Sequence, residues 1–435
     1  MILSLAGVIL FLGLSFGLAA FFRYYDFPFL AGQAESISLK YREAGLPWEI
    51  TDLRSTPPVK REENAANELK LAISTFDQAK FQGESSELFR LLDEGKNSEV
   101  SKRINFYRAS LYHAKLASKK PRLEFGFDYD QGYDLEFPEF QYIKSFVKAL
   151  CIRAVVKQLQ KDSASAIDDL QTAQAISLLP SQDGDFLSIY IQFACQAEVY
   201  GAARRIAPSV SNDEATRKQI RDLLEQPLPQ IDYRQRYMTH SYMILATIRN
   251  HRWGIDGDGP RLPGMRRTGL PATMISKAYA AKLMSFAIKE KPLWDKYRYD
   301  IGSLQKDRAT LDDEAEAQNV ASDYLNGILF PRFGSADAES KLEARRLASL
   351  WLLDALAYKA RTGKFPATIS EIPGHWIDPF SGKPIKFKQF ADSIRIYSVG
   401  PDSKDGGGYR FSETKPTIGY DDIIIAHPPL KNGER

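Results

Sequence analysis

Cysteine and histidine are scarce in this chain, which has two cysteines and five histidines in 435 residues. Cys151 and Cys195 both lie in apolar helical patterns, which favours buried free thiols; a disulfide between them is the alternative in an oxidising compartment. No two histidines fall at the spacing by which one helix binds a metal. The sequence therefore predicts no zinc site.

A strong charge imbalance is also missing. The 58 basic and 55 acidic side chains leave a formal net charge of +3, which is small for this length. Nothing in these totals indicates a nucleic-acid partner. The chain also lacks a phosphate-binding P-loop, a dinucleotide fingerprint and a His-Glu-x-x-His motif. An enzyme is accordingly the less favoured class, and no catalytic or cofactor-binding residue is assigned.

The long apolar run of this chain lies at its start. Residues 1–22 carry no charged side chain, and a run of about 20 apolar residues has the length of a membrane-spanning helix. We predict a single-pass signal anchor over this range. A cleavable signal peptide is the alternative, because residues 17–19 could serve as a cleavage site.

Two regions are expected between the anchor and the last hundred residues. Proline and glycine recur in residues 23–60, which predicts an extended stalk. Apolar residues then recur at helical spacing over residues 61–335, which predicts an irregular helical array interrupted by a glycine-rich loop at residues 251–268. The predicted helices are 62–80, 87–93, 100–118, 140–160, 163–179, 181–207, 212–225, 233–250, 271–289 and 312–329.

The strongest helical signal of this array is the pair 140–160 and 163–179, joined by the polar elbow "K-D-S-A-S-A-I-D-D-L" from Lys161. The pair resembles tetratricopeptide-type hairpins, although their period is not repeated along the chain. The "A-I-D-D-L" stretch and "E-E-N-A-A" from Glu62 resemble a group of uncharacterised bacterial membrane-anchored helical proteins. That resemblance implies no particular activity.

Residues 336–435 combine helix, turn and strand signals. Apolar residues recur at helical spacing over residues 339–362, and Gly363 ends the pattern. A turn is indicated at residues 378–384, an alternating strand at 393–399, and a second strand at 423–425. The fold class predicted for the whole chain is therefore mainly α, with a transmembrane helix, a helical array and a small C-terminal α+β module.

The order of these motifs resembles the C-terminal module of the major pseudopilin of type II secretion systems. The resemblance is carried by "G-K-F-P-A-T-I-S-E-I" from Gly363, "D-P-F-S-G-K-P-I" from Asp378 and "Y-S-V-G-P-D" ending at Asp402. It covers about a fifth of the chain. The processed leader and the glutamate of the family's first helix have no counterpart here. We therefore interpret residues 336–435 as a module shared with that family, and we do not infer a pilus subunit.

The pseudopilin resemblance also implies a metal site, since the final loop of that family binds calcium. By this resemblance the Ca²⁺ ligands are Asp402, Asp405, Asp421 and Asp422, with Ser403 as a further candidate. Aspartates beside glycines and strand ends also supply the hard oxygen ligands that calcium prefers.

The direction of the anchor depends on two opposing signals. Arg23, Lys40 and Arg42 follow the apolar run and nothing basic precedes it, which by the positive-inside rule alone would keep the body in the cytoplasm. The resemblance to a calcium-binding module that works outside the cytoplasm implies export. We expect a bacterial inner-membrane protein whose body faces the periplasm.

Two classes of function follow. The first is an envelope scaffold or binding protein, in which the helical array offers a surface to a protein or peptide partner. The alternative is an envelope hydrolase that uses carboxylates of the loop at residues 119–138. Its candidates are Asp128, Asp130, Asp134 and Glu136.

Overall fold

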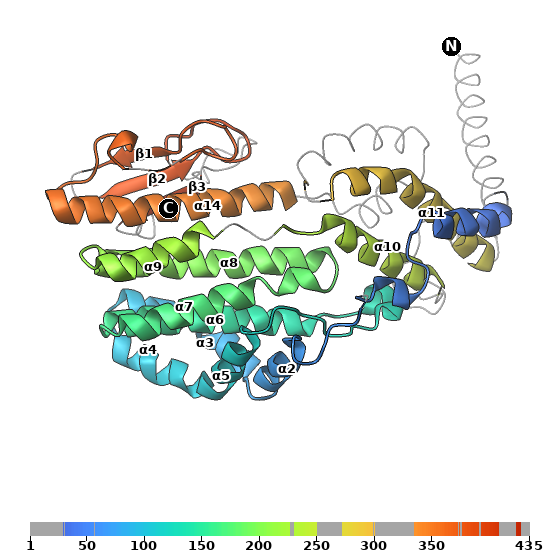
Figure 1. The fold of residues 1–435 in the computed structure, drawn as a ribbon, viewed down its shortest axis with the longest axis horizontal. Coiled ribbons are helices and arrows are strands. Elements are labelled where there is room, and N and C mark those ends of the chain that lie inside the picture. The colour runs from blue at the N-terminus through green and yellow to red at the C-terminus, as the bar shows by residue number, and fades with distance from the viewer. Residues whose placement is uncertain are drawn as a thin grey trace, which may run out of the picture. The chain divides into compact units, whose positions relative to one another are not determined.

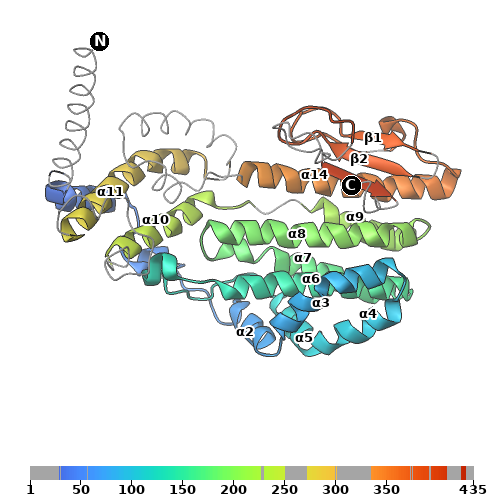
Figure 2. The same ribbon diagram turned by 180° about the vertical axis from the view of Figure 1, so that it is seen from behind.

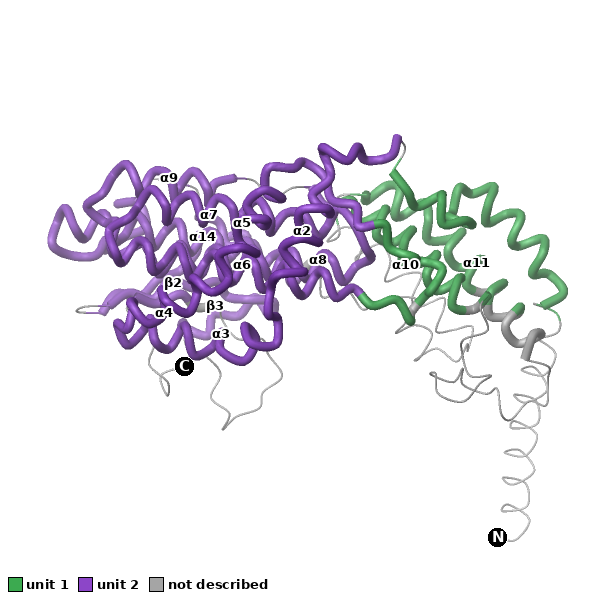
Figure 3. Tube along the Cα trace, turned by 90° about the horizontal axis from the view of Figure 1, so that it is seen from below, with its two compact units in different colours: residues 1–56, 126–136, 232–333 green, residues 57–125, 137–231, 334–435 purple. Residues whose placement is uncertain are grey.

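The computed structural model describes residues 29–249, 272–300, 335–408 and 423–427, apart from residues 30, 56, 227–229, 299, 373, 375 and 391–392. The protein is mainly helical, with a small antiparallel sheet late in the chain, as predicted. The described residues form two compact units (Figure 3). Unit 1 is drawn from residues 29–55, 126–136 and 232–300, and unit 2 from residues 57–125, 137–231 and 335–427.

Unit 1 is built around two helices, α10 (Tyr233–Arg249) and α11 (Ala272–Lys296), which pack against each other. The rings of Tyr237 on α10 and Trp294 on α11 stack with their centroids 4.6 Å apart. Two short 3₁₀ helices, η1 (Ile50–Leu53) and η3 (Tyr129–Asp134), also pack on α10.

The segment predicted as an extended stalk is partly helical in unit 1, and that prediction is wrong for residues 31–43. The helix ends at Gly45, which has φ of 70° and donates its N–H to the Arg42 carbonyl. Leu46 donates to the Tyr41 carbonyl, and Pro47 follows, as is usual after a glycine-capped helix end. The glycine and proline therefore cap a helix here.

Three sequence predictions fall outside the described residues: the membrane span at 1–22, the loop at 251–268 and the helix at 312–329. Within the described ranges, no helix has both the length and the apolar character that crossing a bilayer requires.

Unit 2 holds most of the predicted helical array and the sheet, in layers that Figures 1 and 2 show from opposite sides. The helices α6 and α7 pack on the layer formed by α2 to α5, and α8 packs on α6 and α7. The helix α14 packs on α8 and α9 and carries the sheet on its other side. The elements are α2 (Ala66–Ser74), α3 (Gln78–Asp93), α4 (Asn97–Ile104), η2 (Asn105–Tyr107), α5 (Arg108–Ala117), α6 (Pro138–Leu159), α7 (Ser163–Ser177), η4 (Pro180–Gln182), α8 (Phe186–Ile206), η5 (Ala207–Val210), α9 (Glu214–Glu225), α14 (Ser335–Thr362), η6 (Ile369–Glu371), β1 (Lys386–Gln389), β2 (Ile394–Ser398) and β3 (Ile423–His427).

The predicted helix pair at 140–160 and 163–179 is confirmed as α6 and α7. The polar elbow between them forms the start of α7, where the Asp162 carboxylate accepts a hydrogen bond from the Ser165 N–H at 3.2 Å. This is a side-chain N-cap, which satisfies a donor that the first turn of a helix otherwise leaves unpaired. The residue before it, Lys161, has φ of 65° and lets the chain reverse.

The helix α14 is buried on two sides. The indole of Trp351 is fully buried and lies 4.7 Å from the Phe387 ring of β1, measured between centroids. On the side facing the helices, Arg221 of α9 forms an ion pair with Asp354. Residues 335–427 therefore belong to unit 2 together with the helices of residues 57–231, because α14 supplies apolar side chains to the helical layers as well as to the sheet.

The sheet has the order β1-β2-β3 with both pairs antiparallel. Ile396 lies at its centre, opposite Phe387 on one side and Ile425 on the other. The strands predicted at 393–399 and 423–425 are confirmed as β2 and β3.

Candidate functional site

The loops at the end of β2 are organised by Asp378, a buried aspartate in the predicted turn. Its carboxylate accepts hydrogen bonds from the Ser398 hydroxyl at 2.8 Å and from the N–H groups of Phe380 and Val399, both at 3.0 Å. Three donors compensate a carboxylate for the water it loses on burial. Asp378 therefore ties the turn at 378–383 to the end of β2. Sequence reasoning identified the turn but missed this role, which the Asp-Pro order at its start signals.

Two further hydrogen bonds help to place the turn at 400–405 beside the turn at 378–383. The Gly400 N–H donates to the Ser398 hydroxyl at 3.2 Å, and the Ser403 hydroxyl donates to the Phe380 carbonyl at 3.4 Å. Ser403 has φ of 55°, a left-handed conformation that a turn of this kind requires.

Two of the four predicted calcium ligands lie in this turn. The half-buried carboxylate of Asp402 accepts from the Lys404 N–H at 3.1 Å. The exposed carboxylate of Asp405 accepts from the Gly407 N–H at 2.8 Å and forms an ion pair with Lys386 at 2.6 Å. The hydrogen bond from Lys386 holds the pKa of Asp405 below its ordinary value. Asp405 is thus ionised at neutral pH. Its carboxylate already pairs with the Lys386 ammonium, which would compete with a bound calcium ion.

The other two predicted ligands, Asp421 and Asp422, lie outside the described residues. Among the described residues, no three histidine, cysteine or acidic side chains come together in an arrangement that could hold a metal ion. The set of Asp402, Asp405, Asp421 and Asp422 stays a prediction.

The acidic side chains of the hydrolase alternative lie in residues 126–136, which belong to unit 1. The four candidate carboxylates are all exposed: Asp128, Asp130, Asp134 and Glu136. Asp130 accepts a hydrogen bond from the Tyr242 hydroxyl of α10, and Asp128 accepts one from the Gln131 amide at 3.3 Å. No converging pair of buried carboxylates is seen among the described residues of this loop, so its geometry lends the hydrolase no support.

Gly132 lets the backbone of the acidic loop pack closely against α10. It has φ of 61°, and a Cβ atom at this position would lie 2.1 Å from the Thr247 hydroxyl oxygen and 2.8 Å from the Thr247 nitrogen. Only glycine allows this conformation and this close approach of two backbones. This part of the loop therefore packs against α10 as a structural element of unit 1.

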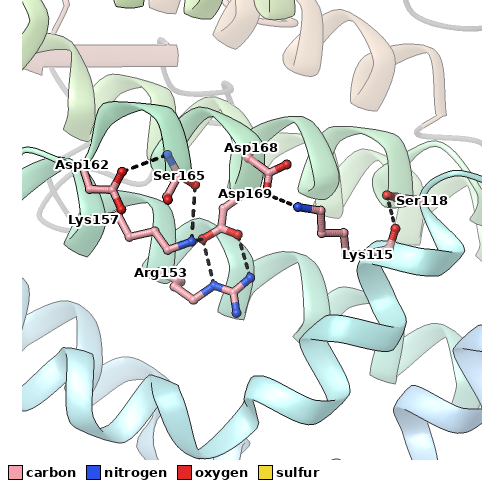
Figure 4. Close-up of polar contacts among 8 residues, drawn as sticks. All are labelled: Lys115, Ser118, Arg153, Lys157, Asp162, Ser165, Asp168 and Asp169. Atoms are coloured by element: carbon pink, nitrogen blue, oxygen red, sulfur yellow. Dashed lines mark hydrogen bonds and ion pairs between the residues drawn. The ribbon is translucent and has the colours of Figure 1, made fainter.

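An ion-pair network in unit 2 links α5, α6 and α7 (Figure 4). The buried Asp169 of α7 accepts two hydrogen bonds from the Arg153 guanidinium, at 2.8 and 2.6 Å, and an ion pair from Lys157 at 2.8 Å. Its neighbour Asp168 pairs with Lys115 of α5. Each carboxylate meets its cation on a different helix, so the network sets the packing of these helices.

The two cysteines are free and buried, as the sequence analysis favoured. Burial raises the pKa of both the Cys151 and Cys195 thiols above their ordinary value. Both are therefore protonated at neutral pH and are poor nucleophiles or metal ligands.

The helix α8 carries two buried amides that lack partners. Gln192 and Gln196 are 0% exposed, and neither the oxygen nor the nitrogen of either side chain makes a hydrogen bond. Their spacing of four residues places them on one face of α8. Sequence reasoning treated this helix as apolar and did not single them out.

Comparison with protein families, with curated proteins and with solved structures found no match to this chain. The resemblance to the pseudopilin module thus depends on the motifs alone.

Proposed function

We propose that this protein is a scaffold or binding protein of the bacterial envelope, and that residues 66–117 of unit 2 offer a surface to a protein partner. The observation that supports this is the exposure of large apolar side chains there. Phe106 is 59% exposed, Tyr112 is 60% exposed and Leu71 is 48% exposed. Large apolar side chains that are exposed are typical of protein interfaces.

Hydrogen bonds between helices hold the elements of this surface together. The helices α2 and α5 are joined by a hydrogen bond of 2.8 Å between the Thr75 and Ser110 hydroxyls and by one of 3.1 Å between His113 and Glu68. The Lys80 ammonium lies 3.6 Å from the centre of the Phe106 ring. A rigid surface that presents aromatic rings and a cation suits a partner with apolar and acidic side chains.

Site-specific photo-crosslinking in cells tests this surface. A photoreactive residue at position 112 should give one defined crosslinked partner, and so should one at position 106. The matched control is position 159, where Leu159 is 44% exposed on α6. The variant carrying Phe106→Ser and Tyr112→Ser should lose the partner without losing thermal stability. The same crosslinks from position 159 would contradict the proposal.

The envelope location is part of the proposal, with residues 1–22 as a single-pass anchor and the body in the periplasm. It is supported by the apolar composition of that range and by the pseudopilin resemblance. The protein should stay with membranes after a carbonate wash, and protease added to spheroplasts should digest the body. Protection of the body would reverse the orientation.

Calcium binding by the C-terminal loops is proposed on the same resemblance, with Asp402, Asp405, Asp421 and Asp422 as ligands. For a site of extracellular type, we expect a dissociation constant on the order of 0.1–1 mM by calorimetry on the full chain. Asp402→Asn should weaken binding. A full chain with the same melting temperature in calcium and in chelator would refute the site.

The ion pair of Lys386 with Asp405 gives a sharper test of the calcium proposal. Lys386→Met removes a cation that competes for the carboxylate, so it should tighten calcium binding about two- to fivefold. The matched control Lys96→Met removes a lysine paired with Glu94 near the start of α4 and should change nothing. Equal affinity in both variants would exclude Asp405 as a ligand.

A further inference from the structure

Arg204 of α8 lies where α8 packs against α14. Its Nη1 atom donates a hydrogen bond to the Ser349 hydroxyl of α14 at 3.1 Å. That hydroxyl in turn donates to the Arg345 carbonyl. Within the described part of the chain, Ser349 is the only hydrogen-bond partner of this guanidinium, and no carboxylate lies within ion-pair distance of it. A guanidinium has five N–H donors, so most of those of Arg204 are unused.

Arg204 lies among other charged side chains. Burial, followed by the charges of Arg345 and Arg205, lowers the pKa of Arg204 to about 10, against the opposite effect of Glu198. Arg205 forms an ion pair with Asp93 and is thereby largely neutralised. The side chain of Arg204 is nevertheless only half-buried, so that solvent reaches it.

This situation differs from that of other enclosed arginines of unit 2. Arg153 binds the Asp169 carboxylate with two N–H groups, and Arg346 binds the Glu343 carboxylate in the same way. A partly buried guanidinium without such a partner loses part of its hydration, and its single hydrogen bond to Ser349 replaces only some of it. An anion that reaches it restores that loss in a medium where charge interactions are stronger than in water.

We infer that the Arg204 guanidinium, which the hydrogen bond to Ser349 holds in place, is a binding site for a phosphate group at the junction of α8 and α14. The planar fork of a guanidinium matches two oxygens of a tetrahedral oxyanion, and hydrogen bonds of this kind are short and strong. A phosphate dianion carries twice the charge of a carboxylate and is therefore attracted more strongly to the guanidinium. The site is independent of the calcium loops and of the surface at residues 66–117.

Titration of the full chain with inorganic phosphate tests this site, with chloride at equal ionic strength and acetate as the comparison anions. Phosphate should bind with a dissociation constant on the order of 1 mM and raise the melting temperature, whereas acetate should bind at least tenfold more weakly. Glycerol phosphate in a parallel arm separates a site for phosphate esters from one for the free ion.

Variants assign the binding to Arg204. Arg204→Gln should weaken phosphate binding at least tenfold, and Arg204→Lys, which keeps the charge and loses the fork, should weaken it less. The control Arg90→Gln removes an exposed arginine already paired with Glu87 and Glu94, and should bind phosphate like the unmodified chain. Arg204→Gln should also be as stable as the unmodified chain without phosphate, because an unpaired cation is removed. Phosphate affinity unchanged in both Arg204 variants, or no phosphate binding to the unmodified chain, would overturn the inference.

Discussion

Replacing Gln192 or Gln196 of α8 with methionine should stabilise unit 2. Both side chains are fully buried, and neither amide makes a hydrogen bond. Methionine has nearly the same length and volume, is also a good helix former, and has no polar group that needs a partner. The substitution therefore removes an unsatisfied amide and leaves the packing of α8 almost unchanged.

The size of this effect follows from the cost of burying an amide without a hydrogen bond, which is about 1–3 kcal/mol in proteins. Each single variant should gain free energy of unfolding in this range. For a unit of this size, one kcal/mol corresponds to about 2–4 °C in melting temperature, so each substitution should add roughly 2–12 °C. The two side chains share one helix face, so the double variant can depart from additivity.

Urea unfolding followed by circular dichroism measures these changes, with the denaturant slope checked for constancy. The control is Gln182→Met, because the Gln182 amide is satisfied. Its oxygen accepts from the Leu123 N–H at 2.9 Å, and its nitrogen donates to the Pro121 carbonyl at 3.3 Å. This variant should lose about 0.5–1.5 kcal/mol. If Gln192→Met and Gln196→Met destabilise the protein as well, internal waters or a ligand satisfy the two amides and the reasoning is refuted.

Three further predictions concern other parts of the fold. Gly132→Ala should destabilise unit 1 by about 2–4 kcal/mol in thermal unfolding, since its Cβ would meet backbone of α10 at a positive φ; an unchanged melt would contradict that docking. Asp169→Asn should cost about 2–3 kcal/mol in urea unfolding, because Arg153 and Lys157 lose their shared carboxylate while solvent still screens part of their charge; a smaller loss than for Asp168→Asn would argue against this role. Burial lowers the pKa of His427, and Lys359 lowers it further. Because the folded-state pKa lies below the unfolded value of 6.5, its contribution to stability is present above that pH and is lost as the pH falls toward the folded pKa. His427→Gln should flatten the unfolding free energy measured between about pH 7.5 and pH 5, and an equally steep loss in the variant would show that other groups cause it.

Local sequence signals determined where many elements of this protein begin and end. The elbow at Lys161 to Ser165 separates α6 from α7 within two residues of the prediction, because a capping aspartate acts through neighbours in the chain. The turn at Asp378 was recognised for the same reason. The signals around Gly45 are equally clear, but the same glycine and proline fit an extended chain, which the sequence predicts, and a helix cap, which the structure has.

The sequence by itself also determined the helical class and the late position of the sheet, because apolar periodicity and turn residues act over short distances. Only the tertiary structure decided which elements pack together. Arg221 pairs with Asp354, 133 residues away, and Phe125 donates its N–H to the Asp183 carboxylate 58 residues away. The helix α14 shows the same limit: its apolar spacing predicts a helix, and only packing decides that it is covered on two sides, by the sheet and by α8 and α9. Whether Arg204, Gln192 and Gln196 meet a partner likewise depends on side chains that packing brings from other helices, and no local pattern encodes that.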